Sequence, residues 1–104
     1  MQFLVIGHDG KDAEALNRRL AARPAHIELG NKLRAEGHHL FGVALLDEFE
    51  KMVGSVLLVD FANRADLDEW LEHEPYVTGK VWQSIEVTRC QVGPSFQGIL
   101  EEAR

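Results

Sequence analysis

The sequence has 104 residues, 45% hydrophobic and 27% charged, which is typical of one globular domain with a core of its own. Its net charge of −6 and the wide spacing of its 11 Lys and Arg residues exclude the concentrated basic surface on which nucleic-acid binding depends. No stretch approaches the roughly 20 apolar residues that a membrane-spanning helix needs, so neither nucleic acid nor a membrane is an expected partner.

The first third of the chain predicts a strand followed by a long helix. Residues 3–8 form an apolar run without the basic leader or cleavage site of a signal peptide, and Asp9-Gly10 after it is a turn signal. Apolar residues then recur at helical spacing: Leu16, Leu20, Leu29 and Leu33. Pro24 cannot donate the hydrogen bond of an interior helical position, so we expect the helix to kink or restart there and to stop at Gly37.

The middle and end of the chain predict two strands, a second helix and a last strand. Residues 39–46 and 52–61 are rich in Val and Leu and are separated by a polar connection of hairpin length. Asn63 is a typical helix N-cap, and the helix that follows must end near Pro75. The buried side of this helix is marked by apolar residues at helical spacing: Leu67, Trp70 and Leu71.

Residues 82–92 alternate between apolar and polar, as a strand does, and the tail from Pro94 predicts one further helical turn. Cys90, the single cysteine of the sequence, lies in this strand and is expected to be a small packing residue. One cysteine excludes an internal disulfide and fits a reducing compartment. We therefore expect a cytoplasmic protein.

The order β-α-β-β-α-β predicts an α+β, ferredoxin-like sandwich with an antiparallel sheet. The strands are apolar on both faces: in residues 39–46, one side carries Phe41, Val43 and Leu45, and the other Leu40, Ala44 and Leu46. Two helices can cover only one face of a four-stranded sheet, so the other would remain a large apolar patch. We expect a second copy to cover it, sheet against sheet, which makes the protein a homodimer.

Four short motifs resemble the YciI-like (YCII-related) proteins. They are the segment 19–26 (Arg-Leu-Ala-Ala-Arg-Pro-Ala-His), Glu36-Gly37, Gly54-Ser55 and the segment 74–77 (Glu-Pro-Tyr-Val), in that order. The likeness extends from the first strand to about residue 92, so residues 1–104 are expected to form one YCII-related domain with a C-terminal extension at 93–104. The resemblance implies a dimeric α/β barrel with a pocket between sheet and helices.

The resemblance also implies a small enzyme with a histidine and an aspartate as its working pair. At least one member of the family removes chloride from a hydroxylated ring. The histidine corresponds to His26, but the family's Asp-Pro motif is replaced here by Glu74-Pro75. One extra methylene moves the carboxylate by more than a preorganised site tolerates, unless the pocket is reshaped to suit.

His26 and Glu74 are the candidate catalytic residues, each with a plainer alternative. His26 shares a helix face with Leu29 and Leu33 and should point toward the sheet, and histidine titrates near neutral pH, as acid-base catalysis requires. Alternatively, it is a histidine at the edge of the core that bonds a backbone carbonyl. Glu74 would fix the imidazole tautomer, as carboxylates do in hydrolase triads, or else it is a solvated carboxylate at a helix end.

Four further residues are candidates for binding a substrate. Arg23 beside Pro24 could hold an anionic oxygen in a fork, or it is a surface arginine. Tyr76 could offer its hydroxyl, or it is a core aromatic residue. Gly54 and Ser55 would let a ligand approach the strand and receive a hydrogen bond, although glycine also marks a plain bulge.

Metal and nucleotide sites are not predicted. His38 and His39 are adjacent on a strand and so point to opposite faces, and with His8 and His73 they match no zinc-binding spacing. The sequence also lacks a P-loop and a GxGxxG motif.

Two functions therefore remain open. The first is a small cofactor-free enzyme, in which His26 and Glu74 catalyse elimination, dehydrochlorination or isomerisation of a small cyclic or enolisable carbonyl compound. The second is a non-catalytic dimeric module that binds a small ligand or supports another enzyme.

Overall fold

Four antiparallel strands form one sheet in the order β2-β3-β1-β4. The structure is a computed structural model and describes residues 1–102. Its elements in chain order are β1 (Gln2–Asp9), α1 (Ala15–Ala35), β2 (His39–Leu46), β3 (Met52–Asp60), α2 (Arg64–His73), α3 (Pro75–Thr78), β4 (Trp82–Cys90), a 3-10 turn (Pro94–Phe96) and α4 (Gly98–Glu102). The predicted ferredoxin-like order of strands and helices is confirmed.

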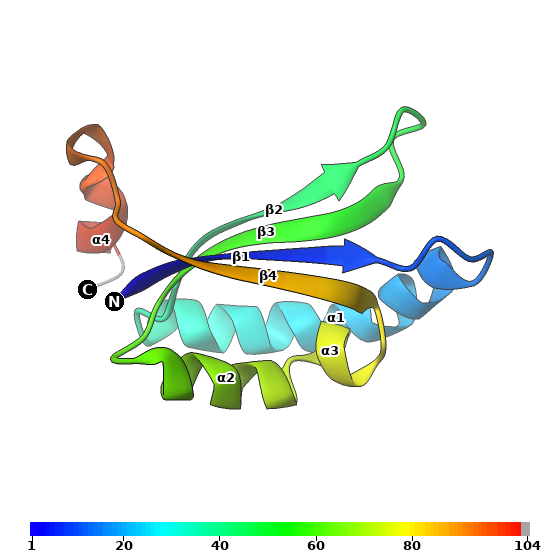
Figure 1. The fold of residues 1–104 in the computed structure, drawn as a ribbon, viewed down its shortest axis with the longest axis horizontal. Coiled ribbons are helices and arrows are strands. Elements are labelled where there is room, and N and C mark those ends of the chain that lie inside the picture. The colour runs from blue at the N-terminus through cyan, green and yellow to red at the C-terminus, as the bar shows by residue number, and fades with distance from the viewer. Residues whose placement is uncertain (103–104) are drawn as a thin grey trace.

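Helices α1, α2 and α3 all lie against one face of the sheet, and the opposite face is open (Figure 1). The core lies between these layers. The inward side chains of β1, Phe3 and Val5, are almost fully buried and pack with Val59 of β3 and with Leu67 and Trp70 of α2. Leu67 and Trp70 are the predicted apolar stripe of α2, because positions three and four apart share one face of a helix.

Helix α1 runs without interruption through Pro24, so the expected restart there does not occur. A proline in a helix leaves the carbonyl four residues earlier without its hydrogen bond. Here that residue is Leu20, which is exposed, so water can satisfy its carbonyl. The helix ends as predicted: Gly37 adopts φ 83°, and the His38 N–H donates to the Leu33 carbonyl at 2.8 Å.

The second helical region differs from the prediction because Pro75 starts a new helix as well as ending the previous one. Asn63 Oδ1 accepts the Asp66 N–H at 2.9 Å and so caps α2, as expected. Glu74 then adopts an extended conformation, and Pro75 occupies the first turn of the short helix α3. This change of direction turns both Glu74 and Tyr76 into the interior, where each is almost completely buried.

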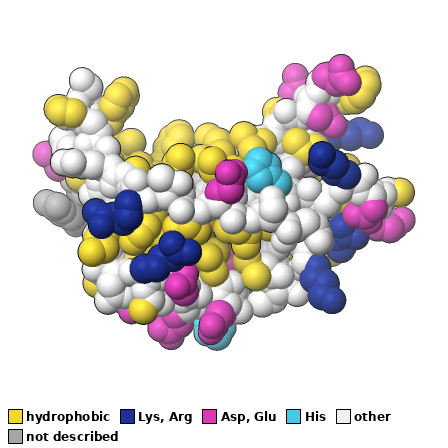
Figure 2. All heavy atoms as spheres, viewed as in Figure 1, with side chains coloured by type: hydrophobic (Ala, Val, Ile, Leu, Met, Phe, Trp, Pro, Cys, Tyr) yellow, Lys and Arg dark blue, Asp and Glu magenta, His cyan; other side chains and the backbone are white. Residues whose placement is uncertain are grey.

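The open face of the sheet carries a continuous apolar band across three strands. Cross-strand neighbours on this face form two rows: Leu4, Leu58 and Phe41, and then Ile6, Val56 and Val43. Phe41 and Val43 are 57% and 45% exposed. In Figure 2, hydrophobic side chains gather above the sheet between two raised ends of the molecule.

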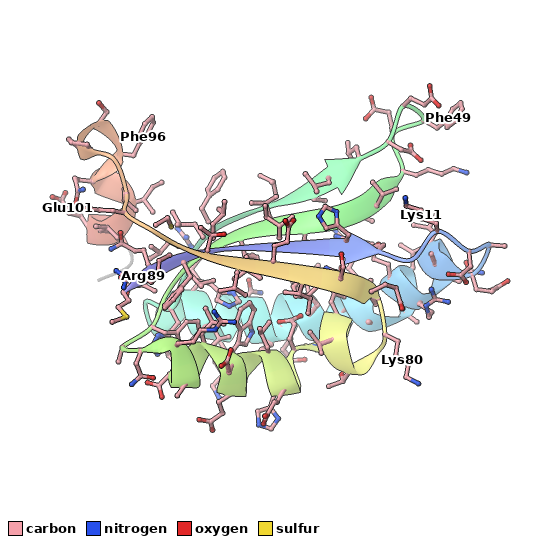
Figure 3. The ribbon with its side chains drawn as sticks, viewed as in Figure 1. Lys11, Phe49, Lys80, Arg89, Phe96 and Glu101 are labelled. Atoms are coloured by element: carbon pink, nitrogen blue, oxygen red, sulfur yellow. The ribbon has the colours of Figure 1, made fainter. Side chains whose placement is uncertain are left out.

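These raised ends are the β2–β3 hairpin and the C-terminal segment. Each carries an exposed aromatic residue, Phe49 at the hairpin and Phe96 in the C-terminal segment (Figure 3). The predicted helical turn in the tail is present as the 3-10 turn and α4, within the described part of the chain. Residues 103 and 104 lie outside the described residues.

Candidate functional site

A buried carboxylate lies at the centre of the candidate site. Glu74 is 0% exposed and accepts hydrogen bonds from three directions. Its Oε1 accepts from His26 Nδ1 and from the Tyr76 backbone N–H at 3.3 Å, and its Oε2 accepts from Trp70 Nε1 at 3.0 Å. A buried carboxylate needs such partners, because each unpaired oxygen would lose its hydration without replacement.

His26 is held between Glu74 and two aromatic rings. Its side chain is 17% exposed, and its ring stacks on Tyr76 with centroids 3.8 Å apart and meets the edge of Trp82 at 6.3 Å. Because the Glu74 carboxylate accepts a hydrogen bond from Nδ1, the neutral imidazole carries its hydrogen on Nδ1 and its lone pair on Nε2. Nε2 makes no hydrogen bond with any described residue, so it is free to accept one.

A cavity of about 230 Å³ opens beside His26, between α1 and the inner side of β2 and β3. Its polar lining includes four side chains: Arg19, Arg23, Ser55 and Tyr76. The small residues Gly42 and Ala44 line it from the inner face of β2, opposite Leu57 and Ser55.

Arg19, which lines this cavity, forms a buried ion pair with Asp9 that the sequence motifs did not predict. Arg19 is 2% exposed, and its Nη1 donates to both carboxylate oxygens of Asp9, at 2.9 and 3.0 Å. Its Nη2 donates to Ser55 Oγ at 2.8 Å, and its guanidinium carbon lies 4.6 Å from the centre of the Tyr76 ring. Burial raises the pKa of Asp9, and the hydrogen bond and charge of Arg19 oppose this shift.

One sequence signal could have revealed Arg19. It precedes His26 by seven residues, which is about two helical turns, so both side chains leave the same face of α1 and both contact Tyr76. Asp9 is the last residue of β1 and lies within hydrogen-bond distance of Arg19. The sequence does not show that Arg19 is the buried one of two adjacent arginines, because such a pair is typical of a solvated helix face.

The structure brings five of the six predicted site residues together. His26, Arg23, Ser55 and Tyr76 line the cavity, and Glu74 lies directly behind His26. Arg23 is exposed and has no hydrogen bond or ion pair with a described residue. Ser55 Oγ accepts from Arg19 and from Trp82 Nε1 at 3.3 Å, so its own proton remains free to be donated.

Gly54 is the exception, since it does not line the cavity. A Cβ atom there would lie 2.7 Å from the Gly7 carbonyl oxygen and 3.0 Å from Leu45 Cδ1. The glycine is therefore explained by the close approach of β1 and β2 to β3, and Ser55 alone of the pair faces the site.

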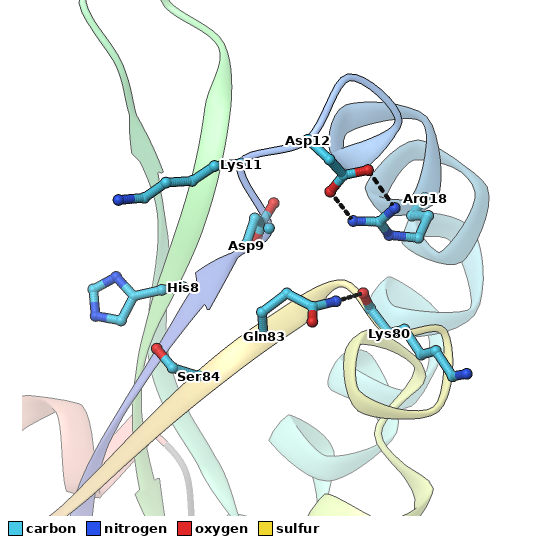
Figure 4. A pocket seen from close by; sticks show the side chains of 9 residues that line it. His8, Asp9, Lys11, Asp12, Arg18, Lys80, Gln83 and Ser84 are labelled. Carbon is cyan, nitrogen blue, oxygen red and sulfur yellow. Dashed lines mark hydrogen bonds and ion pairs between the residues drawn. The ribbon is translucent and has the colours of Figure 1, made fainter.

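A larger hollow of about 770 Å³ lies at the end of β1 (Figure 4). Asp12 and Arg18 lie side by side on its lining and are joined by hydrogen bonds of 2.9 and 2.6 Å, and Gln83 donates to the Lys80 carbonyl at 2.6 Å. It is open to solvent, and most of its lining residues are exposed. We therefore place the candidate site at His26, where buried titratable groups converge on a cavity.

The other histidines lie apart from this site. Burial lowers the pKa of His39 to about 4, and its ring packs edge-on against Trp70. His38 donates to the Asp60 carbonyl at 2.9 Å, and His8 pairs with Glu86 at 3.0 Å on the open face. Within residues 1–102, no three His, Cys, Asp or Glu side chains are grouped as metal ligands. Burial raises the pKa of the half-buried Cys90 thiol.

The fold and the site together define a class: small α+β, ferredoxin-like domains with a buried carboxylate–histidine pair beside a small cavity. The chain belongs to the YCII-related family, because the model of the YCII-related domain matches residues 1–91. The resemblance inferred from the sequence motifs is thus confirmed, and the tail lies beyond the matched region.

Solved structures with the same fold are enzymes by name. One is 5-chloro-2-hydroxyhydroquinone dehydrochlorinase from Burkholderia phenoliruptrix AC1100 in complex with 2,5-dihydroxybenzoquinone, with a TM-score of 0.78 and 21% identity over 91% of this chain and 98% of that one. Another is an antibiotic biosynthesis monooxygenase, with a TM-score of 0.53 and 23% identity over 90% of this chain and 100% of that one. At these identities the likeness establishes the fold alone.

No curated protein sequence matches the chain. Among the residues that the structure describes, no helix is both long and apolar enough to cross a membrane.

Proposed function

We propose that this protein is a small enzyme in which His26, oriented by Glu74, transfers protons on a small cyclic or enolisable carbonyl compound. The observation that supports it best is the buried Glu74, which accepts a hydrogen bond from His26 Nδ1–H and leaves Nε2 as a base beside the cavity. A general base must reach the proton that it removes, and a carboxylate on the far nitrogen stabilises the imidazolium that forms.

The proposed reaction begins when His26 Nε2 removes a proton from a carbon next to a carbonyl group. The electron pair of the broken C–H bond moves to form a C=C bond, and the carbonyl oxygen becomes an enolate. In elimination, the carbonyl re-forms, the electron pair of the enolate C=C bond makes a new C=C bond to the next carbon, and the C–Cl bond at that carbon breaks, so that one proton and one chloride ion are lost. In isomerisation, His26 returns the proton to another carbon.

Three cavity side chains are proposed to bind the oxygens of the substrate. Ser55 has a free hydroxyl proton, Tyr76 has a hydroxyl without a partner among the described residues, and Arg23 is an unpaired cation at the edge of the cavity. Proton transfer of this kind needs no cofactor. The dehydrochlorinase with the same fold provides a substrate class for testing, although this fold is compatible with many reactions.

The test is turnover by the wild type and by His26→Asn. We would measure chloride release from 5-chloro-2-hydroxyhydroquinone and deuterium uptake from D₂O by small cyclic ketones. We expect His26→Asn to lose turnover by about 10²–10⁴-fold with an unchanged fold. His38→Asn is the matched control, because the His38 ring stacks on Phe61 and donates to a backbone carbonyl, and it does not line this cavity. Equal rates in the wild type and His26→Asn would contradict the proposal.

A second candidate is a non-catalytic dimeric module that binds a ligand. It is favoured by the mutual pairing of Asp9, Arg19, Ser55 and Trp82, because such a preformed polar wall suits binding without chemistry. This candidate predicts saturable binding without product, and binding that tolerates His26→Asn.

We also propose that the protein is a homodimer, as expected of a dimeric α/β barrel. The support is the apolar band on the open face of the sheet, which polar β4 residues border on one side. Thr88 and Glu86 oppose Leu4 and Ile6 there.

We further propose that residues 1–104 form a single domain and that the protein is cytoplasmic, since Cys90 has no second cysteine to pair with.

A further inference from the structure

We propose that Arg19 makes the His26 cavity selective for small anions, namely molecules with an ionised oxygen such as an enolate, phenolate or carboxylate. This inference rests on the proposed function, because it concerns the same cavity, but it assigns the ligand's charge and the residue that recognises it.

The hydrogen bonds of Arg19 leave some of its donors free. A guanidinium has five N–H donors, and those of Arg19 make three hydrogen bonds: two to Asp9 and one to Ser55. Its Nε is buried without a partner among the described residues, and at least one N–H of Nη2 is also unused. Buried donors on a cation are costly to leave unpaired, so a ligand oxygen in the cavity would satisfy one of them.

Stability is a poor explanation for the Asp9–Arg19 pair. A buried ion pair loses about as much in desolvation as it gains in attraction, and apolar residues of similar volume are often equally stable. The pair does fix the guanidinium, because Asp9 binds Nη1 through both carboxylate oxygens while the guanidinium carbon lies over the Tyr76 ring. A fixed cation at the wall of a cavity is what recognition of an anionic oxygen requires.

The other polar side chains that line the cavity also offer mainly hydrogen-bond donors. Ser55, Tyr76 and Arg23 each have a donor without an acceptor, whereas the free acceptor is His26 Nε2. The two buried carboxylates, Asp9 and Glu74, already accept hydrogen bonds from protein donors. A complementary ligand therefore has several acceptor oxygens and one acidic proton directed at His26.

The cavity also limits the size of the ligand. Its volume of about 230 Å³ is below the range of roughly 300–1,000 Å³ that is common for drug-sized ligands. We therefore infer a small anion rather than a nucleotide or a peptide.

The test compares ligands of equal size that differ in charge, by calorimetry on the full-length protein at low salt. The pairs are benzoate with benzamide, and 2,5-dihydroxybenzoquinone, whose hydroxyl groups are acidic, with 2,5-dimethylbenzoquinone, in which neutral methyl groups of similar size replace them. We expect the wild type to bind an anion of one pair at least about tenfold more tightly than its neutral partner. Absence of binding by both anions, or equal affinity within both pairs, would overturn the inference without any mutation.

Variants then identify the cation. Arg19→Gln should remove the preference for the anion, and the milder Arg19→Lys should reduce it while keeping the charge. Arg18→Gln is the matched control. Arg18 is adjacent to Arg19 in the sequence, but its Nη1 and Nη2 pair with Asp12 outside this cavity. An anion preference that survives in a folded Arg19→Gln, or that Arg18→Gln removes equally, would also overturn it.

His26→Asn separates this inference from the proposed function. If His26→Asn keeps the anion preference while the wild type shows no turnover, the proposed function fails and the inference stands. If turnover depends on His26 but neutral and anionic ligands bind equally, the inference fails alone.

Discussion

The indole Nε1–H of Trp70 donates to Glu74 Oε2 at 3.0 Å, so the side chain one turn before the end of α2 holds the carboxylate that follows this helix. This bond leaves Oε1 for His26 and for the backbone N–H of Tyr76. The orientation of His26 therefore depends on α1, α2 and α3 packing together. Glu74 reaches His26 here, although the sequence resemblance implied a shorter aspartate at this position.

The first prediction concerns Glu74→Gln, which keeps the size of the side chain and removes its charge. The amide can donate to His26 Nδ1, which would move the imidazole proton to Nε2 and remove the base. We expect turnover to fall by about 10²–10⁴-fold. Chloride release or deuterium uptake measures this effect, with Glu72→Gln on the exposed side of α2 as the control. Unchanged turnover in Glu74→Gln would show that the carboxylate has no catalytic role.

The second prediction concerns the size of the cavity. Ala44 lies opposite Ser55 on the inner face of β2, so a larger side chain in Ala44→Leu would occupy the space beside His26. We expect affinity for 2,5-dihydroxybenzoquinone to fall by about tenfold or more, with little change in the free energy of unfolding, because residue 44 is exposed. Ala25→Leu, on the exposed side of α1, should bind as the wild type does. Undiminished binding by Ala44→Leu would place the ligand elsewhere.

The third prediction concerns the open face of the sheet. Val43→Lys places a charge in the middle of the apolar band, where a second copy would have to desolvate it. We expect the wild type to be a dimer and Val43→Lys a folded monomer when mass is measured by light scattering after gel filtration. Glu69→Lys on α2 is the control and should remain dimeric. A monomeric wild type at micromolar concentration would contradict the proposed assembly.

The fourth prediction concerns stability and pH. The folded state holds His39 neutral with a pKa of about 4, whereas an unfolded histidine has a pKa near 6.5. Between these values the unfolded chain binds more protons, so stability that is fully present above pH 6.5 is lost as the pH falls toward 4. From pH 7.5 to pH 5, His39 alone should lower the free energy of unfolding by about 2 kcal/mol.

His39→Leu tests this prediction, because leucine does not titrate. Urea unfolding at the two pH values should show a smaller pH dependence in His39→Leu than in the wild type, by about 2 kcal/mol. His38→Gln is the control and should keep the wild-type dependence. The same pH dependence in His39→Leu and the wild type would mean that other groups cause it.

Much of the site could be predicted because short segments of the sequence determine how its residues are oriented. The helical spacing of His26, Leu29 and Leu33 directed His26 inward, and the Glu74-Pro75 pair marked a helix end. The burial of Arg19 and the close backbone contacts of Gly54 were not predicted, since these environments depend on segments far away in the sequence. Asp9 and Ser55 make Arg19 a buried group, and the backbone of β1 requires glycine at 54.

The sequence by itself determined the order of elements, the strand faces and the ends of most helices, because hydrophobic period, N-caps and glycine stops act within a few residues. Tertiary structure decided the protonation partner of His26, the burial of Arg19 and the position of the cavity. Each of these depends on contacts between segments tens of residues apart. The distances between these segments are set by how three helices pack on one sheet, which no local sequence pattern encodes.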